Sequence, residues 1–297
     1  MKTKLLYTHA LSPLHAGTGQ GIGVIDLPIA REKATGLPFL PGSSVKGSLR
    51  DVCPNNLRVP LFGPEKNNAE LHAGSVQFSD QRLLLLPVRS LKGTFAWVTS
   101  PYILNRFVRD ACDANANSLV KAVPTPTSNG TVQECFIVNG KTLEMDGKVY
   151  LEDLDLTVSN NAVKKAQAQA WADVFAGEIF TGNWQTFFKE RFCIVPDDVL
   201  NFLLDTATEI TARISIAEDT KTTDKGQLWY EEALPCETVL FGMALAVKIG
   251  SVGLNPDAAL KHIRDDLIKK PIQFGGKATV GRGLCRLTLS KANGGVN

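Results

Sequence analysis

The spacing of apolar residues along the chain predicts a mixture of strands and helices. Short continuous or alternating apolar runs, typical of strands, occupy residues 4–11, 74–78, 83–88, 238–249 and 283–291. Apolar residues that recur every three or four positions, typical of helices, occupy 45–52, 101–115, 162–175, 197–207 and 257–269. Strand, helix and paired strands near the N-terminus, with strand, helix and strand near the C-terminus, predict an α+β fold with ferredoxin-like elements.

Two stretches between these elements differ from them in pattern. Residues 124–148 are rich in Pro, Thr, Asn and Gly, which indicates an insertion with a hairpin rather than a separate domain. Residues 210–236 have two arms of strand character around a polar tip at 218–226, which predicts a long projecting hairpin; a surface loop is the alternative. We therefore expect residues 1–297 to form one domain that carries both features.

Composition narrows the class of protein. Hydrophobic residues make up 44% and charged residues 21%, which is typical of a globular chain. The first apolar run is broken by Thr8 and His9, so it is too short and too polar for a signal peptide or a membrane span. We expect a cytoplasmic protein with no membrane contact. The 6 cysteines are scattered without a C-x-x-C pair, which indicates reduced, mostly buried thiols.

Charge is informative in its distribution rather than in its total. The net charge of +2 is too small to indicate a nucleic-acid binder by itself. Residues 261–291 hold 8 Lys or Arg against 2 Asp, an excess of +6, whereas 144–160 is acidic. This asymmetry suits phosphate binding at one place and self-association at another.

A glycine-rich loop at 274–283 is the main candidate for phosphate binding. Gly275 and Gly276 allow close backbone approach, so that successive N–H groups can face a phosphate, while Lys277 and Arg282 supply positive charge. The spacing fits neither a Walker loop nor a dinucleotide fingerprint, which argues against a small-molecule phosphate enzyme. A tight structural turn explains the same residues equally well.

A second candidate phosphate site lies at the start of the helix predicted at 45–52. Ser43 and Ser44 precede it, and Lys46 and Arg50 are four residues apart, on one face. A capped surface helix with solvated charges is the alternative. A third group includes Arg89 and Lys92, for which a solvated surface is the favoured interpretation.

Three residues are candidates for catalysis. Asp26 follows a glycine-bearing loop and is flanked by apolar residues, where a carboxylate can hold a hydrated divalent metal or position an RNA 2′-hydroxyl. His15 can act as a general acid or base, and Glu231 can supply a second carboxylate. Taken singly, each residue type in such a position is more often structural.

An ordered set of motifs resembles the RAMP superfamily and, within it, the multi-copy backbone subunit of type III-B (Cmr) CRISPR effector complexes. The motifs are HAGTG at 15–19, GVIDLPI at 23–29, RE at 31–32, TG at 35–36, PGSSVKGSLR at 41–50, LPVRSLKGTFAWVT at 86–99 and the glycine loop at 275–283. They span both ends and the middle of the chain, and residues 110–205 match least.

The resemblance implies an RRM-like palm, a thumb hairpin at 210–236 and copies stacked helically along a guide RNA beside other Cmr subunits. It further implies divalent-metal-dependent cleavage of the paired target RNA at regular intervals, with Mg²⁺ as the expected metal. The family's essential aspartate falls on Asp26, as catalytic residue and metal ligand, and His15 and Glu231 are secondary candidates. Guide-backbone contacts fall on the serines and cations of 43–50 and on the glycine loop.

Two other functions remain open at this point. The chain can be a non-catalytic scaffold that binds guide RNA, in which Asp26 is a turn residue. It can also be a repeat-RNA-processing endonuclease of the same superfamily that uses His15. A processing enzyme should work as a free monomer without metal, whereas a backbone subunit should assemble along RNA.

Overall fold

The computed structural model describes residues 1–19, 25–65, 72–130, 132–138, 140–216, 223–249 and 254–291. The strands are β1 (Lys2–Ala10), β2 (Phe39–Leu40), β3 (Val76–Phe78), β4 (Gln81–Ser90), β5 (Thr94–Thr99), β6 (Ser128–Asn129), β7 (Val132–Ile137), β8 (Lys148–Leu151), β9 (Leu154–Val158), β10 (Phe192–Ile194), β11 (Glu209–Ile216), β12 (Thr223–Ala233), β13 (Val239–Ala246), β14 (Ile272–Gln273) and β15 (Leu284–Leu289). The helices are α1 (Gly42–Asp51), α2 (Asn55–Phe62), α3 (Pro101–Asp113), α4 (Gly140–Leu143), α5 (Ala162–Ile179), α6 (Asn183–Lys189), α7 (Asp197–Thr206) and α8 (Pro256–His262).

The centre of the main sheet is built around β1. It pairs antiparallel with β13 on one side and with β15 on the other, and β3 extends the sheet beyond β13. Residues 5–10 of β1 are all buried, since the strand has a neighbour on each edge and contacts helix α3. The chain follows the path β1, α1, β3, β13, α8, β15 through this part, with the spatial order β15-β1-β13-β3.

A closed barrel continues from this sheet and was absent from the sequence prediction. From β4 the order runs β4-β5-β10-β7-β9-β8, and the Ser90–Leu151 pair joins β8 back to β4. Two of its pairings, β10 with β5 and β7 with β9, are parallel. Aromatic side chains fill its end of the core, and the Trp97 and Phe188 ring centroids lie 5.2 Å apart.

The predicted insertion at 124–148 contributes to this barrel. Strands β6 and β7 form a short hairpin within it, and β7 then pairs with β9 and β10. The division of the chain into a core and an insertion stays a prediction, since strand pairing alone does not define a boundary.

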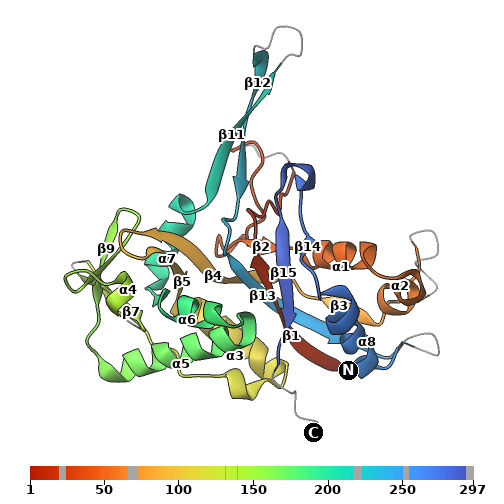
Figure 1. Ribbon diagram of the computed structural model, residues 1–297, viewed down its shortest axis with the longest axis horizontal. Helices are drawn as coiled ribbons and strands as arrows, with labels where there is room; N and C mark the ends of the chain where they lie inside the picture. The colour runs from red at the N-terminus through yellow and green to blue at the C-terminus, as the bar shows by residue number, and fades with distance from the viewer. Residues whose placement is uncertain are drawn as a thin grey trace.

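The hairpin β11–β12 forms a separate two-stranded sheet and projects from the body (Figure 1). Its cross-strand register, from Glu209 opposite Ala233 to Ile214 opposite Leu228, places alternate residues on opposite faces. Part of the predicted polar tip at 218–226 lies outside the described residues, as does 20–24 of the N-terminal glycine loop.

Most predicted elements are present, with differences at their ends. Helix α1 begins three residues earlier than expected, so Ser43 and Ser44 lie in its first turn and Pro41 is the N-cap. The Gly42 N–H donates to Asp80 Oδ1 (2.8 Å), which replaces the expected serine cap. The mixed α/β character is confirmed, and four of the six cysteines are buried, as expected. No described helix is both long and apolar enough to cross a membrane.

Candidate nucleic-acid interface

Asp26 lies at the foot of the projecting hairpin, against strand β12. Its Oδ2 accepts a hydrogen bond from the Tyr230 N–H (2.8 Å). The next residue, Leu27, donates to the Tyr230 carbonyl (3.1 Å) and accepts from the Glu232 N–H (3.0 Å). The segment after the glycine loop is therefore fixed along β12, and it leaves the Asp26 side chain exposed at the surface.

Glu232 completes this attachment, a role that the sequence did not indicate, although it stands beside Glu231 as a candidate second carboxylate. Its buried carboxylate accepts the Ile29 N–H (3.1 Å) through Oε2 and the Arg31 guanidinium (2.6 Å) through Oε1. Arg31 also donates to the Leu204 carbonyl at the end of α7 (3.3 Å). The signal in the sequence was slight: Glu232 directly precedes the apolar pair Ala233-Leu234, so it stands where a strand enters the core.

His15 is buried beneath the same segment. Its Nδ1 donates to the Glu232 carbonyl at 2.6 Å; because a carbonyl only accepts, this nitrogen carries the proton. A Cβ on Gly17 would lie 2.5 Å from Nε2, so the glycine lets the loop pass close to the ring. These contacts favour a structural role for His15, and its catalytic role stays a prediction.

Glu231 is also buried and is surrounded by donors. Its Oε1 accepts from Lys277 Nζ (2.9 Å) and Trp229 Nε1 (2.8 Å), and Arg213 Nε lies 3.4 Å from Oε2. Burial alone would raise the pKa of this carboxyl, but the hydrogen bonds from Lys277 and Trp229 and the positive charges of Lys277 and Arg213 outweigh it, so the pKa falls from 4.5 to about 2. Because protein donors contact both of its carboxylate oxygens, the geometry favours a structural role for Glu231.

The glycine loop between β14 and β15 packs directly on the His15 segment. The Gly276 N–H donates to the His15 carbonyl (3.0 Å) and the Gly283 N–H donates to the Pro13 carbonyl (2.8 Å). Gly275 has φ +72°, and a Cβ there would lie 2.2 Å from the His15 oxygen. Glycine is therefore required here for close approach of two backbones within the protein.

The two cations of this loop differ in exposure. Arg282 is 6% exposed, and its Nη2 donates to Thr211 Oγ1 on β11 (3.0 Å). The Lys277 side chain is 34% exposed, and its ammonium binds Glu231. Both predicted RNA-binding cations thus contact the hairpin, and Arg282 reaches it from inside the protein.

Helix α1 presents its cations differently. Lys46 and Arg50 border a pocket of about 520 Å³ together with Arg58 of α2 and the acidic residues Asp51 and Glu65, and Lys46 is half-buried. One Arg50 nitrogen donates to the Gly63 carbonyl (2.7 Å), which fixes the guanidinium beside the pocket. Ser43 is exposed on the first turn and Ser44 is half-buried, so both remain near this face.

Arg89 and Lys92 lie elsewhere, at the end of β4 that joins β8. Lys92 Nζ donates to the Glu144 carbonyl (2.7 Å), and Arg89 is exposed. Figure 1 shows α1 and strand β9, the partner of β8, on opposite sides of the molecule. The structure therefore does not bring this third group to the α1 pocket or to the glycine loop.

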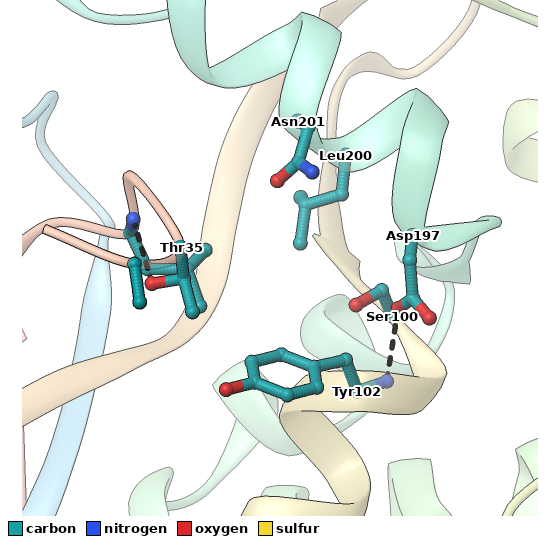
Figure 2. A pocket seen from close by; sticks show the side chains of 8 residues that line it. Thr35, Ser100, Tyr102, Asp197, Leu200 and Asn201 are labelled. Carbon is teal, nitrogen blue, oxygen red and sulfur yellow. Dashed lines mark hydrogen bonds between the residues drawn. The ribbon is translucent and has the colours of Figure 1, made fainter. Parts of the chain in front are cut away.

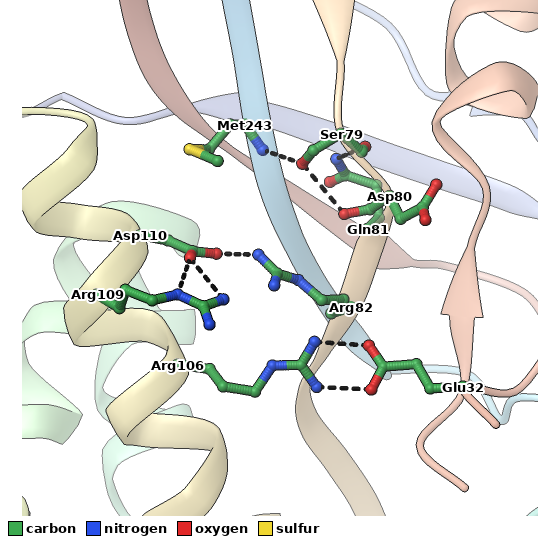
Figure 3. Close-up of polar contacts among 9 residues, drawn as sticks. All are labelled: Glu32, Ser79, Asp80, Gln81, Arg82, Arg106, Arg109, Asp110 and Met243. Atoms are coloured by element: carbon green, nitrogen blue, oxygen red, sulfur yellow. Dashed lines mark hydrogen bonds and ion pairs between the residues drawn. The ribbon is translucent and has the colours of Figure 1, made fainter. Parts of the chain in front are cut away.

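A network of ion pairs holds the loop after Arg31 against α3. Arg106 binds Glu32 through two hydrogen bonds (2.5 and 2.8 Å), and Arg82 of β4 pairs with the buried Asp110 (Figure 3). Beside this loop lies a pocket of about 290 Å³, into whose opening Asn201 and Tyr102 project (Figure 2). None of the described residues that line it is Lys or Arg, and Asp197 contributes negative charge.

A family model described as the RAMP superfamily matches residues 9–286. The chain belongs to the RAMP superfamily. The resemblance read from the sequence motifs is confirmed by this match, which covers nearly the whole chain.

Relatives of this RAMP chain match along its full length. The protein named CRISPR system Cmr endoribonuclease Cmr4, from Pyrococcus furiosus, is 35% identical over 305 residues, covering 100% of this chain and 99% of the relative. A crystal structure of oligomeric Cmr4 from Pyrococcus furiosus has a TM-score of 0.77 and 29% identity, covering 99% of this chain and 100% of that chain. A type III-B Cmr-beta structure bound to cognate target RNA has a TM-score of 0.72 and 18% identity, covering 97% of each chain, and shows the fold alone.

The donors that this RAMP chain offers a metal are few. Across the described residues there is no group of three or more His, Cys, Asp or Glu side chains able to hold an ion. The two oxygens of Glu231 are already taken by protein donors, which leaves the exposed Asp26. A single carboxylate such as this would suit Mg²⁺, which proteins commonly hold through only one or two carboxylates.

Proposed function

We propose that this chain is a backbone subunit of a type III-B CRISPR effector complex, which binds guide RNA and cuts the target RNA paired to it. The full-length similarity to a Cmr endoribonuclease supports the class of activity. The observation that carries the assignment is the exposed Asp26 carboxylate, held at the foot of the projecting hairpin by the Tyr230 N–H. A carboxylate fixed by backbone contacts and open to solvent is available to an RNA strand that lies against the hairpin.

The path of the central sheet supports an RNA-binding core. The order β15-β1-β13-β3, with α1 and α8 as the two crossover helices, is that of a ferredoxin-like or RRM-like domain. In this interpretation the sheet and α1 form the palm, 124–148 is an insertion, and 210–236 is the thumb. Copies stacked helically along one guide RNA, beside other Cmr subunits, would repeat the arrangement at regular intervals.

The RNA contacts proposed for the palm are contacts to phosphates. Base pairing between guide and target reads the sequence, so the protein needs charge and shape rather than base-specific side chains. At the α1 pocket, positive charge comes from Lys46 and Arg50, and the hydroxyls of Ser43 and Ser44 lie nearby as hydrogen-bond donors. We assign the guide backbone to this face.

Cleavage would proceed by attack of a 2′-hydroxyl on the adjacent phosphorus. The new O–P bond gives a 2′,3′-cyclic phosphate; the bond to the 5′-oxygen breaks, and this oxygen takes a proton from water to leave a 5′-hydroxyl end. Asp26 would orient the attacking hydroxyl and accept its proton, while Tyr230 fixes the carboxylate through Oδ2. A Mg²⁺ ion held by Asp26 and RNA phosphates would supply charge stabilisation when bound.

The experiment is to assemble the chain with guide RNA and its partner subunits, and to add end-labelled complementary RNA with and without Mg²⁺. Evenly spaced cuts that need Mg²⁺ support the proposal. Binding of the target without cuts would instead indicate a scaffold subunit. Cutting of repeat RNA by the free chain without metal would indicate the processing enzyme.

A further inference from the structure

The cations of the glycine loop are directed toward the hairpin, and this arrangement suggests a role distinct from RNA binding. We infer that Lys277 and Arg282 are positioning residues that brace the hairpin β11–β12 against the core and thereby hold Asp26 in place. The inference rests on the proposed function for its effect on cleavage, but the brace itself is a property of the protein alone. Figure 1 shows the loop between β14 and β15 rising beside the lower part of the hairpin.

Each cation holds a different strand of the hairpin. Lys277 binds Glu231 of β12 at 2.9 Å, and Arg282 binds Thr211 of β11 at 3.0 Å. Thr211 and Glu231 are directly opposite each other in the hairpin register, so the two contacts meet the same rung and the same face. A loop of ten residues therefore holds both strands at one level.

The loop is itself fixed to the core at two points. Hydrogen bonds to the Pro13 and His15 carbonyls attach it to the segment that follows β1. His15 in turn donates to the Glu232 carbonyl (2.6 Å), which closes a ring of contacts from core to loop to hairpin and back. A displacement of the hairpin must break one of these contacts.

The brace acts on Asp26 through β12. Tyr230, whose N–H binds the Asp26 carboxylate, directly precedes Glu231, the partner of Lys277. Glu232, the next residue, binds the Leu27 carbonyl through its N–H and the Ile29 N–H through its carboxylate. The three consecutive residues of β12 thus connect the brace to the segment that carries the candidate catalytic group.

Two physical points argue that the contacts matter. A two-stranded hairpin is marginally stable in water by itself, so its direction depends on what its base contacts. Glu231 is 1% exposed, and loss of a cation would leave a buried carboxylate with weaker compensation. The other terminal nitrogen of Arg282, Nη1, is buried and has no hydrogen-bond partner among the described residues. Because it is buried, it does not face an RNA phosphate at the surface.

The test separates a brace from a phosphate contact by salt dependence. Lys277→Gln and Lys46→Gln complexes are compared for guide RNA affinity across salt concentrations and for single-turnover cleavage at saturating target. Loss of one phosphate contact lowers the slope of log affinity against log salt by about 0.7 for a single strand. We expect this change for Lys46→Gln, whereas Lys277→Gln keeps the wild-type slope and loses about tenfold or more in cleavage rate through misplacement of Asp26.

Two further variants keep the inference falsifiable. Glu231→Gln should reproduce the loss of Lys277→Gln, and the double variant should be no slower than the slower single, because both remove the same contact. Lys277→Arg, which retains the charge, should restore part of the rate. A lowered salt slope for Lys277→Gln, or additive losses in the double variant, would overturn the brace.

Hydrogen exchange makes failure of the brace distinguishable from failure of the proposed function. In the RNA-free chain, Lys277→Gln should increase amide exchange in β12 and leave α3 unchanged, whether or not any complex cuts RNA. Unchanged exchange in β12 would refute the brace. A wild-type complex that fails to cut would refute the nuclease while leaving this result intact.

Discussion

The glycine loop and helix α1 both carry cations that the sequence marked as phosphate ligands, yet the structure uses these cations differently. On the loop, Lys277 and Arg282 are tied to the buried Glu231 and to Thr211. On α1, Lys46 and Arg50 border an open pocket of about 520 Å³. The comparison teaches that the role of a cation in a glycine-rich loop depends on which groups it contacts. Glycines allow close backbone approach, and that approach can serve packing within the protein as well as ligand binding.

The largest effect expected on the loop side comes from Gly283→Ala. The residue has φ +79°, and a Cβ would lie 1.9 Å from the Phe274 oxygen, so the loop must move. We expect a loss of about 3 kcal/mol or more in the free energy of unfolding, measured by urea denaturation.

The matched control is Gly281→Ala, which has φ +80° and open space around its Cβ position. It carries the cost of the backbone conformation alone, about 1 kcal/mol. Equal losses for the two variants would show that the loop is not packed as tightly against Phe274 as the structure indicates.

Glu232→Gln should have the next largest effect, because it weakens the attachment of the Asp26 segment. It removes the charge that binds Arg31 at 2.6 Å, in a pair that is buried on the glutamate side and partly exposed on the arginine side. We expect a loss of about 1–3 kcal/mol in stability and a lower cleavage rate. Glu190→Gln, which alters a long 3.8 Å pair with Arg191 in which only the glutamate side chain is well exposed, serves as control and should change stability by about 0.5 kcal/mol or less.

A smaller effect is expected on the α1 side. Lys46→Gln should weaken guide RNA binding about three- to tenfold near 0.1 M salt, since one phosphate contact is lost. Arg89→Gln, at the barrel end of β4, should leave the affinity within about twofold. Affinities are measured by filter binding. If Arg89→Gln weakened guide RNA binding more than Lys46→Gln, the guide RNA would be assigned to the barrel rather than to α1.

The smallest effect expected is that of mild acid on the hairpin foot. The lowered pKa of Glu231 means that its ion pair stabilises the fold fully above the unfolded value of 4.5 and loses this contribution as the pH falls toward about 2. Protection of β12 amides, corrected for intrinsic exchange, should therefore be constant from about pH 8 to about pH 5. A decline in protection between about pH 8 and about pH 5 would show that a group other than Glu231 controls the stability of the hairpin foot.

Local patterns predicted much of the fold, and pairing between distant strands accounts for what they missed. The helix at 101–115 and the strand at 4–11 have strong periodicity, and both exist as α3 and β1. The closed barrel depends on pairs such as Ser90 with Leu151, which leave no local signal. Strand β10 has only three residues, too few for a pattern.

In the candidate site, too, local sequence indicated some features, whereas others depend on contacts between distant residues. The sequence indicated Asp26 and the glycine loop as separate features, and the structure brings them to one hairpin foot through β12. It did not indicate that Glu231 would be buried, because Lys277 and Arg213 are 46 and 18 residues away along the chain. Burial of a charge depends on partners that only the fold assembles.

Cleavage by Asp26→Asn is the most direct test that this residue makes the chain a nuclease. The variant keeps the acceptor for the Tyr230 N–H and removes the charge, and Asp153→Asn, an exposed carboxylate between β8 and β9, is the control. In single-turnover assays on the assembled complex, we predict target binding within about twofold of wild type and a cleavage rate lower by about a hundredfold or more, with the control unaffected. Cleavage by Asp26→Asn at the wild-type rate would contradict the assignment.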